Sequence, residues 1–308
     1  MPKVENIHSL IDSQQNFRAG YVAVIGLPNV GKSTLLNHLI KQKLSIVTRK
    51  PQTTRKSVLG ILNDQGFQIV FMDTPGIINP RYNLQTVMMR FVKHAIKDAD
   101  IIVYMVDIAD KRQTPKEMQE QLNAVKNKPV ILAINKIDKK DKREILPMIE
   151  KYSGIHSFKA ILPISAEQDD GLDQLVAEMV KLLPFSPPYF PTDYISDQQE
   201  RFFVAEIIRE KIFKFYSKEI PYSTHVEIEA FSEQKTGKDL IRAVIYVERK
   251  SQKGILIGKK GLSLKKVGQY AREDIEQFLG RPVFLKLFVK VSPDWRKKDA
   301  MLKRLGFS

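Results

Sequence analysis

The sequence predicts two domains of different fold class: an α/β domain with a mostly parallel, six-stranded sheet covered by helices on both faces, then a smaller α+β domain. Short apolar runs alternate with helical patterns as far as about Leu183, and four prolines follow within residues 184–191. The order of elements changes after these prolines, which disfavour both helix and central strand. We therefore expect an N-terminal extension over residues 1–19, a first domain over 20–183, a linker over 184–200 and a second domain over 201–308.

Five apolar runs are expected to form buried strands of the first domain: Tyr21–Ile25, Phe67–Met72, Ile101–Val106, Val130–Ile134 and Ile161–Ile164. Continuous apolar runs separated by helices are typical of a parallel sheet with both faces covered. A sixth strand, Ser57–Leu62, is followed by a polar turn and should form a hairpin with the strand that begins at Phe67. Thr114, Pro115 and Glu117 have the spacing of a helix N-terminus with a capping box.

The second domain is expected to have the order α-β-β-α-α-β followed by a tail. Its first helix and first two strands are expected at Phe202–Tyr216, Thr224–Phe231 and Leu240–Glu248. Two helical segments should flank Gly258–Gly261, before a last strand at Val283–Val291 and a terminal helix over Asp294–Arg304.

Charge is distributed unevenly along the chain. The formal net charge is +15, and residues 201–308 hold 24 Lys and Arg against 13 Asp and Glu, a net +11. Such a domain is suited to a polyanion, either nucleic acid or acidic lipid. The absence of cysteine excludes disulfides and thiolate zinc sites, so any metal should be held by oxygen. No run approaches the roughly 18 apolar residues of a membrane span, and we expect a cytoplasmic protein.

A phosphate-binding loop is predicted between the first strand and the helix that follows it. Residues 26–33 match G-x-x-x-x-G-K-[ST], the motif in which backbone N–H groups surround phosphates at a helix N-terminus. Lys32 would neutralise the β- and γ-phosphates, and the Ser33 hydroxyl would bind Mg²⁺. The expected nucleotide-binding residues of this loop are Gly26, Asn29, Val30, Gly31, Lys32, Ser33 and Thr34.

A second motif, Asp73-Thr74-Pro75-Gly76, follows a predicted buried strand. Asp73 would therefore lie at the carboxyl end of that strand, where open α/β sheets bind ligands, and could hold Mg²⁺ through a water molecule. The Gly76 N–H could contact a γ-phosphate. Either Thr53 or Thr54 could complete the Mg²⁺ shell, and we favour Thr54. The predicted catalytic set is thus Lys32, Thr54, Asp73 and Gly76.

Base selection is predicted at the ends of two later strands. In Asn135-Lys136-Ile137-Asp138, the Asp138 carboxylate can accept two hydrogen bonds from the edge of guanine, which adenine cannot offer. Asn135 would brace the loop, and the stem of Lys136 would cover the base. Ser165 and Ala166 could offer a backbone N–H to guanine O6. This pattern argues against an ATP-driven RNA remodeller, which would prefer adenine.

An RNA-binding loop is predicted inside the basic domain. Ile257-Gly258-Lys259-Lys260-Gly261 contains I-G-x-x-G between two expected helices, with two lysines at its centre. In KH domains, such paired glycines let a nucleic acid backbone lie against the loop, and about four unpaired nucleotides are held.

Together the motifs resemble those of the Era- and TrmE-type P-loop GTPases, in which G-x-P-N-x-G-K-S, T-T-R and D-T-P-G occur together. A single GTPase domain, a proline-rich linker and a type II KH domain resemble the Era family from about Gly20 to the C-terminus. The resemblance implies GTP hydrolysis, binding to the 3′ end of 16S ribosomal RNA and a role in assembly of the 30S subunit.

The resemblance also bears on hydrolysis. Ile77 occupies the position where Ras-like enzymes carry a water-orienting glutamine, so intrinsic hydrolysis should be slow. Relatives of this type use a potassium ion near the phosphates, held partly by an asparagine that matches Asn29.

Two further expectations concern partners. We expect a monomer. The alternative function is a signalling GTPase attached peripherally to the inner face of the cell membrane, with its basic domain on anionic lipid.

Overall fold

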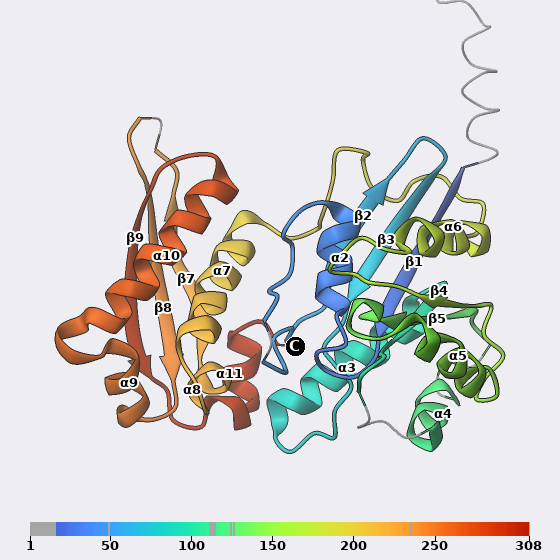
Figure 1. Ribbon diagram of the computed structural model, residues 1–308. Helices are drawn as coiled ribbons and strands as arrows, with labels where there is room; N and C mark the ends of the chain where they lie inside the picture. The colour runs from blue at the N-terminus through green and yellow to red at the C-terminus, as the bar shows by residue number, and fades with distance from the viewer. Residues whose placement is uncertain are drawn as a thin grey trace, which may run out of the picture. The chain divides into compact units, whose positions relative to one another are not determined.

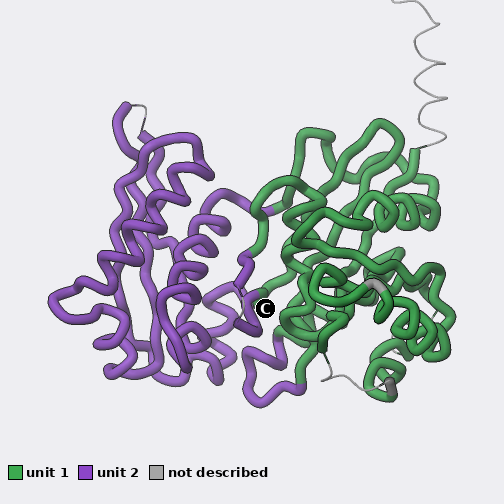
Figure 2. Tube along the Cα trace, in the orientation of Figure 1, with its two compact units in different colours: residues 1–45, 54–78, 88–197 green, residues 46–53, 79–87, 198–308 purple. Residues whose placement is uncertain are grey.

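Figure 1 shows the computed structural model of the chain. The structure describes residues 17–48, 50–110, 115–123, 125, 127–234 and 236–307. Most of the expected N-terminal extension and Thr114 of the expected capping box lie outside these residues. The chain divides into two compact units (Figure 2). Unit 1 comprises residues 1–45, 54–78 and 88–197, and unit 2 comprises 46–53, 79–87 and 198–308.

Unit 1 contains the predicted sheet of six strands. In chain order they are β1 Arg18–Ile25, β2 Val58–Asn63, β3 Phe67–Asp73, β4 Ile101–Asp107, β5 Val130–Asn135 and β6 Ala160–Pro163. The spatial order is β2-β3-β1-β4-β5-β6, and all neighbours are parallel except the β2–β3 hairpin. The mostly parallel α/β fold is confirmed. Since β1, β3, β4 and β5 are central, their side chains are buried on both faces.

Helices cover both faces of this sheet (Figure 1). They are α2 Lys32–Ile40, α3 Asn83–Asp98, α4 Pro115–Asn123, α5 Ile145–Ser153 and α6 Leu172–Leu182, with short 3₁₀ turns η1 Ile137–Lys139 and η2 Lys142–Glu144. The α4 helix begins at Pro115, as the sequence predicts. One core cluster joins residues of β1, β4 and β5 to residues of α3 and α4. This packing fixes the strand ends that carry the expected nucleotide motifs.

The proline-rich linker runs along β2 and β3 of unit 1. Ile61 N–H donates to the Ile195 carbonyl at 2.9 Å, and Ser196 Oγ donates to the Leu59 carbonyl at 2.6 Å. The Gln68 side chain accepts from the backbone N–H groups of Tyr189 and Phe190. The linker thus satisfies backbone groups of the edge strand β2, which would otherwise stay unpaired.

The longer elements of unit 2 follow the predicted order α-β-β-α-α-β, and a short helix, α8, lies between the first helix and the first strand. Its elements are α7 Glu200–Phe215, α8 Ile220–Ser223, β7 His225–Ser232, β8 Asp239–Val247, α9 Lys250–Ile257, η3 Lys259–Gly261, α10 Leu262–Leu279, β9 Val283–Val291, η4 Trp295–Lys297 and α11 Asp299–Arg304. The sheet order is β7-β8-β9, with β7 antiparallel and β9 parallel to β8. Residues of α7, α9 and α10 pack against one face of this sheet to form a single core.

The terminal helix is shorter than the sequence predicts. Instead of a helix over Asp294–Arg304, a 3₁₀ turn precedes α11. Asp294 adopts a left-handed conformation with φ of 53°, and Trp295 is fully buried, with Nε1 donating to the Ser223 carbonyl at 2.8 Å. Burial of this ring fixes the chain direction before the helix begins.

Unit 2 also includes two segments that the sequence assigns to the first domain. From residues 46–53, Lys50 Nζ donates to the carbonyls of Phe213 and Tyr216 at the end of α7. Arg209 Nη2 on α7 donates to the Thr53 carbonyl at 2.6 Å. The Arg209–Thr53 contact joins residues 156 positions apart, so residues 46–53 pack with elements that follow the linker. The boundary expected at residue 183 stays a prediction.

The second such segment, residues 79–87, contacts the C-terminal tail of unit 2. The Arg296 guanidinium lies 4.9 Å from the centroid of the Tyr82 ring, and Asn83 Nδ2 donates to Asp299 Oδ1 at 2.8 Å. Both 46–53 and 79–87 thus belong to unit 2 through specific polar contacts.

Candidate functional site

The predicted phosphate loop connects β1 to α2 and depends on two glycines. Gly26 has a φ of 146° and Gly31 a φ of 106°. A Cβ atom at Gly26 would lie 2.2 Å from the Met105 carbonyl oxygen, and one at Gly31 would lie 2.2 Å from Asn135 Nδ2. Only glycine fits these positions, and the loop therefore keeps its backbone N–H groups close to the start of α2.

Lys32, the first residue of α2, is buried with 6% of its surface exposed. Its Nζ donates to the carbonyl oxygens of Gly26 and Leu27 at 3.2 and 2.9 Å. Burial lowers the pKa of Lys32 to about 8, although the nearby Asp73 carboxylate acts in the opposite direction. Because a buried cation is costly without an anion, this side chain is well suited to phosphate.

Hydroxyl and carboxylate oxygens meet at the carboxyl end of β3. Asp73 is 1% exposed, and its Oδ2 accepts hydrogen bonds from Ser33 Oγ at 2.9 Å and Ser45 Oγ at 2.8 Å. Thr54 Oγ1 lies 2.9 Å from Ser33 Oγ and 3.5 Å from Asp73 Oδ2. Burial raises the pKa of Asp73, and the hydrogen bonds from Ser45, Ser33 and Thr54 oppose that shift, as does the charge of Lys32.

This oxygen cluster fits a divalent cation. Within the described residues, the buried Asp73 Oδ1 has no hydrogen-bond partner, so it could accept from a water molecule on the metal. The structure brings Thr54, not Thr53, to Ser33. Thr53 Oγ1 instead donates to the Lys50 carbonyl at 2.8 Å. The described residues contain no group of three or more His, Cys, Asp or Glu that could hold a metal, so hydroxyl groups and phosphates would have to complete the shell.

The Asp73–Gly76 segment is bonded directly to β1 and the phosphate loop. Thr74 Oγ1 donates to the Val24 carbonyl at 2.7 Å, and Ile77 N–H donates to the Gly26 carbonyl at 3.0 Å. A Cβ atom at Gly76 would lie 2.6 Å from the Pro28 backbone. The Ile77 side chain packs against the core cluster of unit 1 and offers no polar atom to a water molecule.

Asn135, at the end of β5, joins two loops of the expected base pocket. Its Nδ2 donates to the Val30 carbonyl at 2.7 Å, and its Oδ1 accepts from the Ala166 N–H at 2.9 Å. The side chain therefore braces the phosphate loop against the loop after β6. Lys136 Nζ donates to the Asn29 carbonyl and to Asp107 Oδ2, both at 2.6 Å, which fixes the lysine stem beside the pocket.

Asp138 is exposed, and its Oδ1 accepts from Ser165 Oγ at 2.6 Å. The Ser165 hydroxyl thus orients the carboxylate that the sequence assigns to guanine. The two N–H groups expected to reach guanine O6 already have acceptors, since Ser165 N–H donates to the Asp170 carbonyl and Ala166 N–H to Asn135. If either N–H group also donates to guanine O6, its hydrogen must be shared between O6 and the acceptor that it already has.

Sequence reasoning missed three residues of this site: Asn37, Ser45 and Asp107. Asn37 Oδ1 accepts from the N–H groups of Leu44 and Ser45, and its Nδ2 donates to the Ser45 carbonyl at 2.8 Å. This places the Ser45 hydroxyl on Asp73. No motif marks these residues, although Asp107 could have been found as a polar residue that ends a buried strand.

In unit 2 the predicted RNA-binding loop lies between α9 and α10. Gly258 and Gly261 have φ of 72° and 77°, and a Cβ atom at Gly258 would lie 2.1 Å from Ser263 Oγ. Lys259 and Lys260 are exposed. Ile257 is half-buried and packs against the core of unit 2, so its side chain contributes to the stability of the fold.

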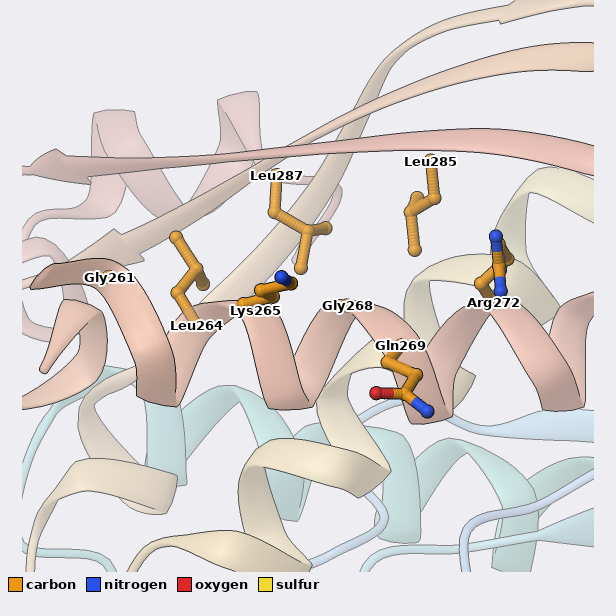
Figure 3. Close-up of a pocket in the computed structure, with 8 residues that line it drawn as sticks. All are labelled: Gly261, Leu264, Lys265, Gly268, Gln269, Arg272, Leu285 and Leu287. Atoms are coloured by element: carbon orange, nitrogen blue, oxygen red, sulfur yellow. The ribbon is translucent and has the colours of Figure 1, made fainter.

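A groove of about 470 Å³ begins at this loop and runs between α10 and β9 (Figure 3). Its α10 side is lined by Gly261, Leu264, Lys265, Gly268, Gln269 and Arg272, and its β9 side by Leu285 and Leu287. A Cβ atom at Gly268 would make an ordinary van der Waals contact with Leu287 at 3.4 Å, so a side chain there would narrow the groove. The groove combines an apolar floor with polar and cationic side chains, and the sequence motif alone did not reveal it.

No helix among the described residues is long and apolar enough to cross a bilayer.

Two family models match the chain. Residues 21–136 match the model described as "50S ribosome-binding GTPase", and residues 219–296 match the KH domain model. These ranges contain the phosphate loop and the Gly258–Gly261 loop, respectively.

Similarity to known proteins extends over almost the whole chain. GTPase Era of Geotalea daltonii is 45% identical over 295 residues, covering 96% of this chain and 99% of that protein. GTPase Era of Geobacter metallireducens is 46% identical over 300 residues, covering 96% and 100%.

Two solved structures are similar to the chain over almost its whole length. A variant of Era from Aquifex aeolicus bound to GDP and AlF₄⁻ has a TM-score of 0.91 and 41% identity, covering 95% of this chain and all of that one. Era in complex with MgGDPNP and nucleotides 1506–1542 of 16S ribosomal RNA also has a TM-score of 0.91 and 41% identity, covering 95% and 99%. These relatives are more than 40% identical to the chain over almost its whole length, and the chain therefore belongs to the Era family of GTPases.

Proposed function

We propose that this GTPase is a nucleotide-dependent switch that binds unpaired RNA near the 3′ end of 16S ribosomal RNA and assists assembly of the 30S subunit. The observation that carries the RNA-binding part is the exposed pair Lys259 and Lys260, held at a glycine loop that opens into the groove of Figure 3. The solved relative with nucleotides 1506–1542 of 16S ribosomal RNA supports the choice of RNA.

At the nucleotide site, each group has a role that its surroundings support. The N–H groups of residues 29–34 would surround the phosphates, and Lys32 would neutralise them because it is buried and without an acidic hydrogen-bond partner among the described residues. Mg²⁺ would be held by Ser33 and Thr54, and by Asp73 through water. When bound, the ion would supply positive charge that stabilises the negative charge of the phosphates.

Guanine would be selected by Asp138, whose orientation is set by the Ser165 hydroxyl. The Asn135 side chain holds the phosphate loop close to Ala166 through hydrogen bonds to both. An adenine base would leave the carboxylate without its two donors, so ATP should bind weakly.

Hydrolysis without a further factor should be slow. The Ile77 side chain packs in the core and cannot orient the attacking water, and the Gly76 N–H would contact a γ-phosphate. We propose that a potassium ion beside Asn29 supplies part of the missing stabilisation. A hydrolysis rate that is the same in potassium and sodium buffers would contradict this role.

Coupling between nucleotide and RNA would use segments 46–53 and 79–87, which adjoin Thr54 and the Asp73–Gly76 motif in sequence. Binding of Thr54 to Mg²⁺ would change the position of residues 46–53, which precede it. Hydrogen bonds of Arg209 and Lys50 join this segment to α7 of the KH domain. The nucleotide state would thereby change how the RNA-binding unit is held.

The function is tested by crosslinking the GTP-loaded protein to RNA in cells and sequencing the bound RNA. We expect fragments from the 3′ end of 16S ribosomal RNA, and enrichment of unrelated RNA would contradict the proposal. The alternative, a peripheral membrane GTPase, is tested by flotation with anionic liposomes at matched salt, in which we expect no binding. We also propose that the protein acts as a monomer, which light scattering would check.

A further inference from the structure

One face of the three-stranded sheet of unit 2 packs against helices, and part of the other face is open. The core face presents odd-numbered residues of β8 and β9, so the even-numbered residues point to the opposite face. There the strand register pairs Leu240 with Phe284 and Val244 with Phe288. Phe284 is 50% exposed, Phe288 45% and Leu240 38%. Phe284 with its neighbour Leu240, and Phe288 further along β9, therefore leave apolar surface exposed on this face, whereas Val244 is buried.

Cations are interleaved with these rings. Lys286 lies between the two phenylalanines in β9, and its Nζ is 5.2 Å from the centroid of the Phe284 ring. In the part of the chain that the structure describes, Lys286 has no acidic partner. Arg242, opposite Lys286 in the register, shares Glu229 with Lys290. The Glu229 carboxylate therefore pairs with both Arg242 and Lys290, while Lys286 has no acidic partner among the described residues. These four side chains together carry a net positive charge.

An unpaired nucleic acid strand matches this chemistry. Its bases have flat faces that stack on aromatic side chains, and its phosphates are attracted to the lysine between them. Phe284 and Phe288 are four residues apart in an extended strand, so the two rings are about 13 Å apart along β9. A regular spacing of ring, cation and ring suits a polyanion with a repeating base and phosphate. The net charge of +11 over residues 201–308 favours an anionic occupant over a basic peptide.

The open face and the groove share one strand. Leu285 and Leu287 of β9 line the groove beside α10, and Phe284, Lys286 and Phe288 alternate with them on the opposite side. Since β9 is at the edge of the sheet, no further strand of the sheet separates the two surfaces. An RNA strand leaving the groove can therefore pass over the free edge of β9 onto the open face.

We infer that the open face of β9 is a second RNA-binding surface, on which bases of the unpaired strand stack on Phe284 and Phe288 while Lys286 contacts a phosphate. The inference rests on the proposed function, because it takes the strand in the groove as the source of these nucleotides. It deepens that function by extending the length of RNA that is bound.

The test compares two RNA lengths on full-length protein. One oligonucleotide has about four unpaired nucleotides, enough for the groove, and the other is extended by about six at both ends. Phe284→Ala/Phe288→Ala should bind the short RNA as the natural protein does and lose roughly tenfold per ring in affinity for the long RNA. The control, Phe185→Ala/Tyr194→Ala, removes two exposed rings of unit 1 and should change neither affinity. Equal loss of affinity for both lengths, or no loss for either, would overturn the second surface.

Lys286 gives a separate readout. Lys286→Ala should lower the salt dependence of long-RNA binding by about 0.7 in log–log slope, the amount expected for one phosphate on a single strand, and Lys286→Arg should restore it. A photo-crosslinking thiouridine in the extension should label residues 283–291. Labelling only of other segments would overturn the assignment.

The two proposals fail in different ways. If the natural protein does not bind the short RNA, the groove part of the proposed function fails, whereas ring-dependent binding of the long RNA would still support the open face. If the short RNA binds and the extension adds no affinity, the open face is not an RNA site. A face that docks a protein instead would leave both RNA affinities unchanged when the rings are removed, and this outcome also overturns the inference.

Discussion

The nucleotide pocket of unit 1 and the glycine loop of unit 2 both suit a phosphate, and they do so in opposite ways. In the pocket, Lys32 is buried and Asp73 is bonded to three hydroxyl groups. In the loop, Lys259 and Lys260 are exposed beside an open groove. The charged groups of the pocket are buried and bonded to neighbouring protein groups, whereas the cations of the loop are exposed to water.

This difference should appear in how each site loses its ligand. Buried groups discriminate strongly, because a wrong ligand leaves them unpaired in a low dielectric. Exposed lysines give affinity that depends on salt and little on sequence. Substitutions in the pocket should therefore abolish binding or change its selectivity, and substitutions in the loop should weaken binding and its salt dependence.

The largest expected effect is that of Lys32→Ala. Removal of a buried cation from beside two phosphates should reduce GTP affinity about a thousandfold, since each charged hydrogen bond is worth roughly 1.5–3 kcal/mol. Isothermal titration calorimetry measures this directly. Without nucleotide, the variant and the natural protein should bind RNA with the same affinity. A loss of RNA binding by the variant under these conditions would show that the two sites are not separate.

Asp138→Asn should change selectivity. The amide replaces an acceptor with a donor, so GTP affinity should fall about a hundredfold and xanthine nucleotides should bind better than guanine nucleotides. Competition binding with GTP and XTP checks the result. Unchanged preference for guanine would remove Asp138 from its assigned role.

Charge reversal of the loop should affect RNA alone. Lys259→Asp/Lys260→Asp is expected to weaken binding of unpaired RNA about thirtyfold or more at physiological salt, with GTP affinity retained. Fluorescence anisotropy at several salt concentrations should also show a smaller slope. Lys93→Asp/Lys97→Asp, two exposed lysines of α3, is the matched control and should leave RNA affinity within about twofold.

Asn37→Ala should produce the smallest effect. Three hydrogen bonds from this side chain hold residues 44 and 45, and their loss should lower the free energy of unfolding of unit 1 by about 1–2 kcal/mol. Denaturant melts without nucleotide measure it. Because Ser45 is then less firmly held on Asp73, the loss should shrink when GTP and Mg²⁺ are bound and Asp73 contacts the hydrated ion instead. An equal loss in both conditions would contradict the link between Asn37 and the metal site.

The fold was predictable from the sequence because its signals are local. Apolar runs such as Ile101–Val106 identify central strands, and the prolines of residues 184–191 mark the end of the first series of elements. The nucleotide motifs lie at strand ends, where the topology of a parallel sheet brings them together without further information.

Contacts between distant segments were not predictable in this way. The bond between Arg209 and Thr53 and the stacking of Arg296 on Tyr82 depend on how elements pack, and no local pattern encodes them. The same holds for Ser45, whose hydroxyl reaches Asp73 only because Asn37 folds its loop. The tail differs for a related reason, since burial of Trp295 overrides a helical pattern.

The central claim is that guanine nucleotide controls RNA binding through segments 46–53 and 79–87. Its most direct test is the affinity of the natural protein for a 3′-end fragment of 16S ribosomal RNA, measured with Mg²⁺ and either a non-hydrolysable GTP analogue or GDP. We predict clearly tighter binding with the GTP analogue, by about tenfold or more, as is usual for coupled sites. The same affinity in both nucleotide states would contradict the account.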